Sequence, residues 1–128
     1  MTLQEVYTSN APKAVGAYSQ AIVSGDMLYT SGQIGLDPTS GEMVADDVAS
    51  QARQVVKNLT AVISEAGGSL SQIVKVTIFL EDMNDFATVN QIYADWLGQH
   101  KPARSTVAVA SLPLGAKVEM DCIVALGS

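Results

Sequence analysis

Apolar and polar residues form six short extended runs along the chain, a pattern typical of β-strands. Clusters of Gly, Pro, Asn and Asp separate several of these runs and mark turns and loops. The Ser-Gly-Asp between the second and third runs predicts a hairpin, with Gly25 able to take a positive φ. The predicted strands are residues 3–7, 18–23, 27–31, 73–80, 105–110 and 117–126.

Two further segments carry apolar residues at helical spacing. Residues 47–66 predict the first helix, which Asp46 or Asp47 can cap at its start. Asn84 is expected to cap a second helix that Gly98 closes. The element order is therefore β-β-β-α-β-α-β-β, which predicts an α+β fold with one mixed sheet and both helices on one face.

Two helices on one side leave the other face of the sheet uncovered. The last predicted strand alternates between aliphatic residues and a set that begins with Glu119. The strand before it alternates between Val107 with Val109 and a set that contains Arg104 and Thr106. We assign the purely aliphatic sets to the core, which places Arg104 and Glu119 on neighbouring strands of the second face. Because that face mixes small apolar residues with few charges, we expect other subunits to cover it.

Composition fits one domain over residues 1–128 with a substantial apolar core. Hydrophobic residues make up 48% of the chain. Charged residues make up 16%, against the roughly 25% that is usual, which agrees with a surface partly covered by other copies. The formal net charge of -6 and the scattered Lys and Arg residues argue against nucleic acid as a partner.

Several other classes of protein are disfavoured. No apolar run approaches the ~20 residues that span a membrane, so we expect no membrane association. The N-terminus lacks the basic start and apolar run of a signal peptide, so we expect a cytoplasmic protein. With one cysteine, Cys122, and one histidine, His100, neither a disulfide within the chain nor a metal site is expected.

Arg104 and Glu119 are the candidate functional pair. The planar guanidinium of an arginine grips a carboxylate through two hydrogen bonds. A glutamate beside it can hold a water molecule or take its proton. A structural salt bridge between the two residues is the alternative, because ion pairs are common at interfaces. Residue spacing alone leaves both interpretations open.

Four stretches of the chain resemble the RidA family of enamine/imine deaminases, also called the YjgF family. PARSTVAVASLPLGAKVEM, residues 102–120, resembles the C-terminal motif of that family. The other three are APKAVGAYSQA from Ala11, TSGQIGLDPTSGE from Thr30 and FLEDMNDFATVNQIYADW from Phe79. The resemblance covers nearly the whole chain, with the motifs in the same order and at the same spacing.

The resemblance implies a fold like that of chorismate mutase of the bacillus type. It also implies a homotrimer whose sheets form a central barrel, with ligand clefts between subunits. The implied reaction is the hydrolysis of reactive 2-imino acids, such as 2-iminopropanoate and 2-iminobutanoate, to 2-oxo acids and ammonia. This reaction protects enzymes that depend on pyridoxal phosphate (PLP), and it needs no cofactor.

The resemblance also implies roles for single residues. Arg104 matches the arginine that binds the substrate carboxylate, and Glu119 matches the acidic residue that holds or deprotonates water. Tyr18 matches a tyrosine whose hydroxyl donates toward the substrate or the water, although a ring packed at an interface is the plainer interpretation. The remaining expected substrate-binding positions are Ser31, Gly32, Asn90 and Thr106.

Two alternatives stay open at this point. Some relatives act as regulators or chaperone-like proteins, and others bind small metabolites without turnover, so a non-catalytic binding protein is one alternative. A hydrolase that acts on a different C–N bond is the other. The presence of both Arg104 and Glu119 favours an enzyme, because a pure interaction surface requires neither residue at that spacing.

Overall fold

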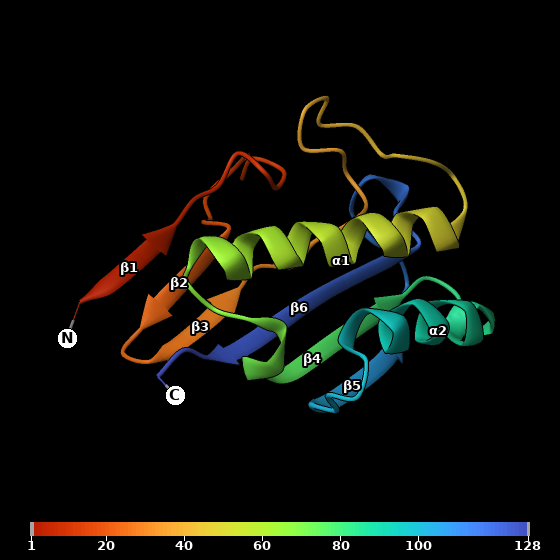
Figure 1. Ribbon diagram of the computed structural model, residues 1–128. Coiled ribbons are helices and arrows are strands. Elements are labelled where there is room, and N and C mark those ends of the chain that lie inside the picture. The colour runs from red at the N-terminus through yellow and green to blue at the C-terminus, as the bar shows by residue number, and fades with distance from the viewer. Residues whose placement is uncertain (1, 128) are drawn as a thin grey trace.

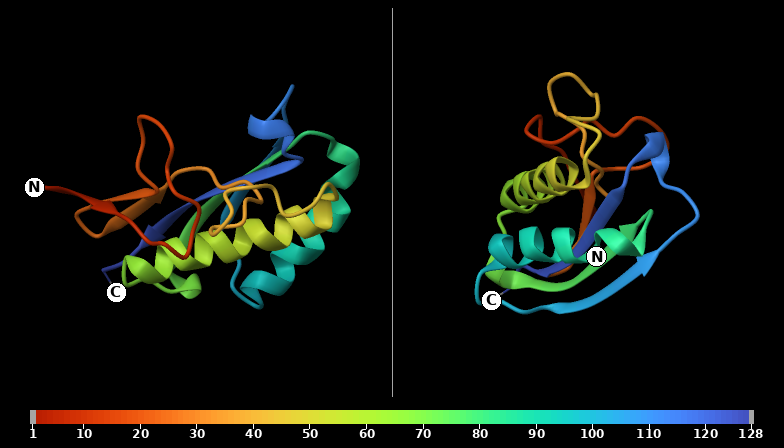
Figure 2. Two further views of the ribbon diagram at one scale, coloured as in Figure 1. Left: turned by 90° about the horizontal axis from the view of Figure 1, so that it is seen from above. Right: turned by 90° about the vertical axis from the view of Figure 1, so that its right-hand side faces the viewer.

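The strands form a single mixed sheet with the order β1-β2-β3-β6-β4-β5 (Figure 1). The computed structural model describes residues 2–127. Both helices lie on the same side of the sheet, which curves around them (Figures 1 and 2). The elements are β1 (Leu3–Val6), β2 (Ala21–Ser24), β3 (Met27–Thr30), α1 (Val48–Glu65), β4 (Ile73–Leu80), α2 (Phe86–Leu97), β5 (Ala103–Ala108) and β6 (Val118–Ala125). The predicted element order is confirmed.

Turn and cap residues explain where most elements begin and end. Gly25, with φ of 62°, lies in the turn between β2 and β3, as expected. Asp47 caps α1, because its side chain accepts a hydrogen bond of 2.8 Å from the backbone N–H of Ser50. The predicted cap of the second helix is wrong. The cap position of α2 is Asp85, whose side chain makes no capping hydrogen bond, and Asp82 caps the short 3₁₀ turn that precedes the helix.

The crossover through α2 sets the strand order. β4 and β5 pair in parallel, and α2 joins them along the chain. β6 then enters between β3 and β4 and pairs antiparallel with both. The prediction that the last two strands are neighbours is therefore wrong, since β4 separates β5 from β6. β5 lies at the edge of the sheet.

The core lies between the sheet and the helices. The inward residues of β6 are at most 1% exposed, which confirms the predicted orientation of that strand; they are Val118, Met120, Cys122 and Val124. The orientation predicted for β5 is wrong. Val107 is 44% exposed on the open side of the sheet, whereas Arg104 contacts α2 on the covered side. Because β5 is an edge strand with little cover on either face, its alternation of apolar and polar residues does not show which face is buried.

The open face of the sheet carries large apolar side chains. Tyr29 on β3 is 46% exposed, and Val107 on β5 is comparably exposed. Among residues 2–127, no helix combines the length and apolar character needed to cross a bilayer. The exposed apolar residues of this sheet face are typical of a surface that meets another protein.

Candidate active site

Four of the seven predicted site residues line one hollow of about 650 Å³. The hollow lies among the loop before β2, the loop after β3 and the start of β6. Its wall also includes Asp121, a second carboxylate of β6. The four predicted residues in it are Tyr18, Ser31, Gly32 and Glu119.

Glu119 projects from the open face of β6 into this hollow, because its neighbour Val118 points into the core. Partial burial raises the pKa of the Glu119 carboxyl, and the nearby Asp121 raises it further. The pKa of Asp121 is also raised by burial, while Lys75 lowers it. A carboxyl group whose pKa is raised in this way is suited to exchange protons with a bound water molecule.

Gly32 makes room for the Glu119 carboxylate. A Cβ atom at position 32 would lie 2.8 Å from the Glu119 Cδ, closer than real side chains approach. The φ angle of Gly32 is not in the left-handed region, so the glycine is required by this contact and not by the backbone conformation. Gly32 therefore belongs to the site because the absence of a side chain leaves room for the Glu119 carboxylate.

Ser31 and Gln20 hold the loop that carries Tyr18. The Ser31 hydroxyl donates a hydrogen bond of 2.6 Å to the Ser19 carbonyl, so its proton is already engaged. The buried Gln20 side chain accepts from the Thr8 N–H at 2.7 Å and donates to the Pro12 carbonyl at 2.8 Å. Tyr18 itself is 52% exposed at the rim of the hollow. The structure therefore places Tyr18 beside the hollow and makes Ser31 a support of the loop.

The other three predicted residues gather at β5 and α2. Arg104 donates from Nη1 to the Asn90 Oδ1 at 2.7 Å. The guanidinium carbon also lies 4.9 Å from the centre of the Tyr93 ring and 5.4 Å from that of Phe86. Thr106 follows Arg104 on the same face of β5, and its buried hydroxyl has no hydrogen-bond partner among the described residues.

Arg104 and Glu119 lie on opposite faces of the sheet. Arg104 pairs in register with Val76, which is fully buried beneath the helices. Glu119 pairs with Phe79, and strand residues an odd number of positions apart point to opposite sides. The two side chains therefore do not meet within one chain. A structural salt bridge between them inside the chain is excluded.

Sequence reasoning missed the aromatic residues around Arg104. Phe86, Asn90 and Tyr93 are spaced by four and three positions, so they lie on one face of α2. That spacing is visible in the sequence, but it also predicts a core face. The crossover that brings β5 beneath α2 is what turns this helix face toward the guanidinium.

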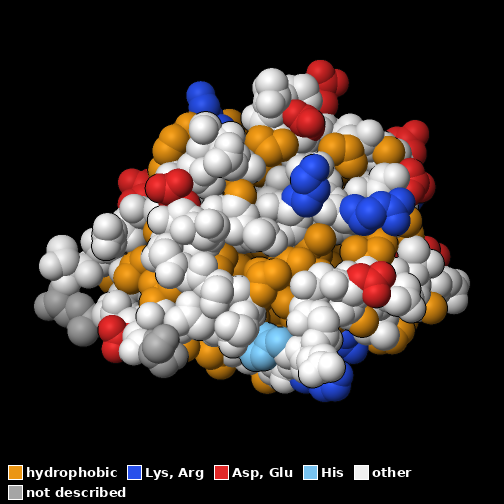
Figure 3. Space-filling model, in the orientation of Figure 1, with side chains coloured by type: hydrophobic (Ala, Val, Ile, Leu, Met, Phe, Trp, Pro, Cys, Tyr) orange, Lys and Arg blue, Asp and Glu red, His pale blue; other side chains and the backbone are white. Residues whose placement is uncertain are grey.

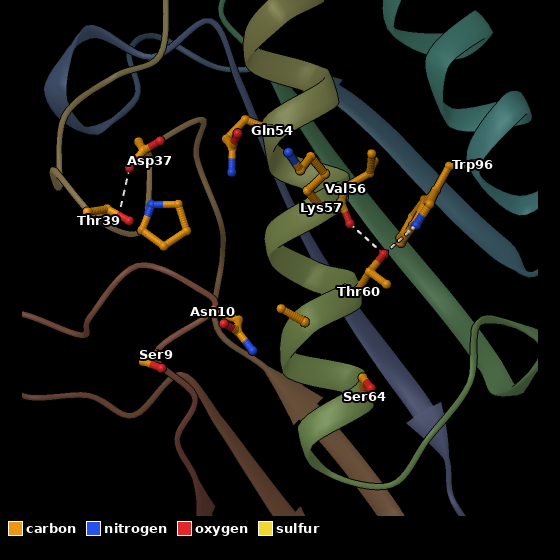
Figure 4. Close-up of a pocket in the computed structure, with 12 residues that line it drawn as sticks. Ser9, Asn10, Asp37, Thr39, Gln54, Val56, Lys57, Thr60, Ser64 and Trp96 are labelled. Carbon is orange, nitrogen blue, oxygen red and sulfur yellow. Dashed lines mark hydrogen bonds between the residues drawn. The ribbon is translucent and has the colours of Figure 1, made fainter.

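A separate hollow of about 640 Å³ lies over the outer side of α1 (Figure 4). None of the predicted site residues lines it. Some of its polar groups bond one another: Trp96 Nε1 donates to the Thr60 hydroxyl at 2.9 Å, and that hydroxyl donates to the Val56 carbonyl at 2.7 Å. Asp37 accepts from the Thr39 N–H at 2.8 Å. Because none of the predicted site residues lies in this hollow, it takes no part in the candidate site.

Other features restrict the chemistry of the described residues. Burial raises the pKa of the Cys122 thiol to about 12, so it stays protonated and unreactive at neutral pH. Residues 2–127 contain no cluster of three or more His, Cys, Asp or Glu residues that could hold a metal ion. On the side covered by the helices, Lys and Arg side chains stand apart among acidic and apolar ones, without a continuous basic surface (Figure 3).

Comparisons with known proteins agree over nearly the whole chain. A family profile described as Endoribonuclease L-PSP matches residues 8–126. A RutC family protein of Pyrococcus horikoshii is 48% identical over 118 residues, which cover 92% of this chain and 94% of the relative. A protein of Rattus norvegicus named 2-iminobutanoate/2-iminopropanoate deaminase is 45% identical over 122 residues, covering 95% of this chain and 89% of the relative. The crystal structure of E. coli TdcF with bound serine is 42% identical with a TM-score of 0.91, covering 95% of this chain and 98% of the other.

Proposed function

Because the chain belongs to the Endoribonuclease L-PSP family, the family of the RidA and YjgF proteins, we propose that it hydrolyses small 2-imino acids to 2-oxo acids and ammonia. The substrates proposed are 2-iminopropanoate and 2-iminobutanoate, the acids named for the rat relative. The observation that carries the proposal is a pair of hollows: the one already described, which contains the half-buried Glu119 carboxylate, and a second of about 440 Å³ between α2 and the start of β5, which contains the Arg104 fork. The expected benefit is protection of PLP enzymes from reactive imines.

The proposed active unit is a homotrimer. Arg104 and Glu119 leave the sheet on opposite faces, so one ligand can meet both only where two chains come together. The apolar open face, with Tyr29 and Val107, and the edge strand β5 support an assembly of copies. We propose that Arg104 of one subunit faces the hollow of its neighbour that contains Glu119.

In the proposed reaction, the substrate carboxylate binds the Arg104 fork through two hydrogen bonds. Water, held by Glu119, attacks the carbon of the protonated C=N group as Glu119 accepts a proton, and the π electrons move to nitrogen. The carbinolamine then collapses: Glu119 returns its proton to the nitrogen, the C–N bond breaks as the C=O bond forms, and the departing ammonia takes up the hydroxyl proton and leaves as ammonium. Tyr18 donates a hydrogen bond toward the water or the substrate. Imine and water thus give oxo acid and ammonia, without a cofactor.

Two observations bear on the substrate. TdcF, the structural relative, is described with bound serine, which carries the same small carboxylate group as the proposed substrates. The family description names an endoribonuclease, but the net charge of -6 opposes binding of a polyanion such as RNA. A location in the cytoplasm remains a prediction from the sequence.

The proposal is tested by generating 2-iminobutanoate with a threonine dehydratase and following its conversion to 2-oxobutanoate. The wild-type chain should accelerate the conversion, and Arg104→Ala and Glu119→Gln should each lower kcat/KM by about a hundredfold or more. Arg53→Ala is the matched control, because it removes an exposed arginine of α1 that lies away from both hollows. Full activity in Arg104→Ala would refute the assigned role. A wild-type chain that binds 2-oxobutanoate without turnover would instead be a binding protein.

A further inference from the structure

One face of α2 is turned toward the Arg104 guanidinium. Phe86, Asn90 and Tyr93 follow one another at helical spacing, and each of them contacts that group. Asn90 supplies a hydrogen-bond acceptor, and the two rings supply the negative faces that attract a cation. Three residues of one helix thus contact the guanidinium, one through a hydrogen bond and two through their rings.

These contacts matter because Arg104 is otherwise poorly held. It is an exposed residue of the edge strand β5, and the structure gives its guanidinium no carboxylate partner among the described residues. A free arginine side chain samples many rotamers and loses that freedom when it binds a ligand. A guanidinium already fixed by its surroundings loses less, so it binds an anion more tightly.

The hydrogen bond to Asn90 also determines which N–H donors of the Arg104 guanidinium remain available to a ligand. Its Oδ1 takes one N–H of Nη1 at 2.7 Å, and the guanidinium presents five N–H donors in one plane. The remaining donors stay free for a carboxylate, while the ring contacts hold the guanidinium plane. Asn90 is therefore placed to act on the ligand through Arg104.

We propose that Phe86, Asn90 and Tyr93 are positioning residues that fix the Arg104 fork for a small planar carboxylate. This inference rests on the proposed function for the identity of the ligand, and it assigns Asn90 an indirect role. The Tyr93 ring carries the effect, not its hydroxyl, because that hydroxyl is buried without a hydrogen-bond partner among the described residues. The three residues set the affinity for the carboxylate and leave the chemical step at Glu119 largely unchanged.

The experiment measures binding of 2-oxobutanoate, the stable product acid, to the full chain by calorimetry. Asn90→Ala should weaken binding by about tenfold through loss of a charge-assisted hydrogen bond. Tyr93→Leu should weaken it by about fivefold through loss of the ring contact. Tyr93→Phe keeps the ring and should bind like the wild type. Val89→Ala is the matched control, since Val89 is a buried residue of the same helix that is not among the contacts of Arg104.

Kinetics and folding complete the test. In the imine assay, the positioning variants should raise KM while kcat stays within about twofold of the wild type. If Tyr93→Leu fails to fold, Phe86→Leu removes the other ring from a less buried position. The inference is overturned if Asn90→Ala and the ring variants bind 2-oxobutanoate as tightly as Val89→Ala does, or if Tyr93→Phe is as weak as Tyr93→Leu. A wild-type chain that binds 2-oxobutanoate, with the predicted losses in the variants but no imine hydrolysis, would support the positioning role and refute the proposed function.

Discussion

The Arg104 guanidinium and the Glu119 carboxylate project from opposite faces of one sheet, with β4 between the strands that carry them. Arg104 is held by Asn90 of α2, and Glu119 faces a hollow beside Gly32. A ligand that touches both groups must therefore bridge two chains. This relationship makes subunit mixing an informative experiment.

Mixing two inactive variants should restore activity. Arg104→Ala keeps Glu119 intact, and Glu119→Gln keeps Arg104 intact, so a mixed assembly contains some interfaces with both functional groups. In every trimer that contains both variants, one of the three interfaces pairs an intact arginine with an intact glutamate, so the purified mixed assemblies should show about a third of wild-type activity. Co-expression with two affinity tags, purification on both and the imine assay provide the measurement.

Each variant alone is the control and should stay inactive. Mixing Arg104→Ala with the double variant Arg104→Ala, Glu119→Gln should restore nothing, because no chain then supplies the arginine. Mixed assemblies as inactive as their parents would contradict a site shared between chains.

The close approach of Gly32 to Glu119 predicts a second outcome. Gly32→Ala places a Cβ 2.8 Å from the Glu119 Cδ, so the carboxylate must move. A displacement of this size should lower kcat/KM by about tenfold to a hundredfold with little change in Tm. Gly127→Ala is a matched control, because its Cβ would lie 2.7 Å from the Asp26 Cγ, a carboxylate outside both hollows. Equal activity of the two variants would contradict the role of Gly32.

The sequence predicted the order of the helices and strands and the bounds of the central strand β4. Residues 73–80 were predicted as a strand and form β4 with those bounds. The alternation from Val118 to Val124 predicted which side of β6 is buried, because this strand is central and one of its faces packs under α1. Membership of the family, inferred from four motifs, is confirmed by the match over residues 8–126.

The same reasoning failed for β5, and the reason is physical. In an edge strand, an apolar residue such as Val107 can face the surface, and a charged residue such as Arg104 can face a helix. The order of strands in a sheet depends on long-range pairing, which the sequence of one strand does not encode. The sequence therefore predicted that Arg104 and Glu119 are functional but not that they belong to opposite faces.

The raised pKa of Glu119 predicts how stability changes with pH. Burial disfavours the charged carboxylate in the folded chain, so its pKa lies above the ordinary value of 4.5. Between the ordinary pKa of the unfolded chain and the raised pKa of the folded chain, the folded state binds more protons than the unfolded state. The free energy of unfolding therefore falls as pH rises through this interval. Glu119→Gln removes the free-energy cost of burying the charged carboxylate. The Tm difference between variant and wild type should therefore be more positive at pH 7.5 than at pH 4.

Calorimetry at both pH values and equal chain concentration gives this comparison. Glu81→Gln, which changes an exposed glutamate beyond the end of β4, is the control and should shift Tm by a similar amount at both pH values. A Tm gain of Glu119→Gln that is larger at pH 4 would reverse the predicted sign. It would show that the folded chain favours the charged form of Glu119.

Gln20 should prove more important for stability than its position in a loop suggests. It is 2% exposed, and its amide bonds the Thr8 N–H at 2.7 Å, the Thr8 carbonyl at 3.0 Å and the Pro12 carbonyl at 2.8 Å. Gln20→Met fills the same space but leaves these backbone groups unpaired, which should cost about 2–4 kcal/mol of unfolding free energy. Gln91→Met, which removes one exposed bond to Asp95, should cost less than about 0.5 kcal/mol. Denaturant unfolding of both variants separates these values, and equal losses would mean that the Gln20 amide does not hold this loop.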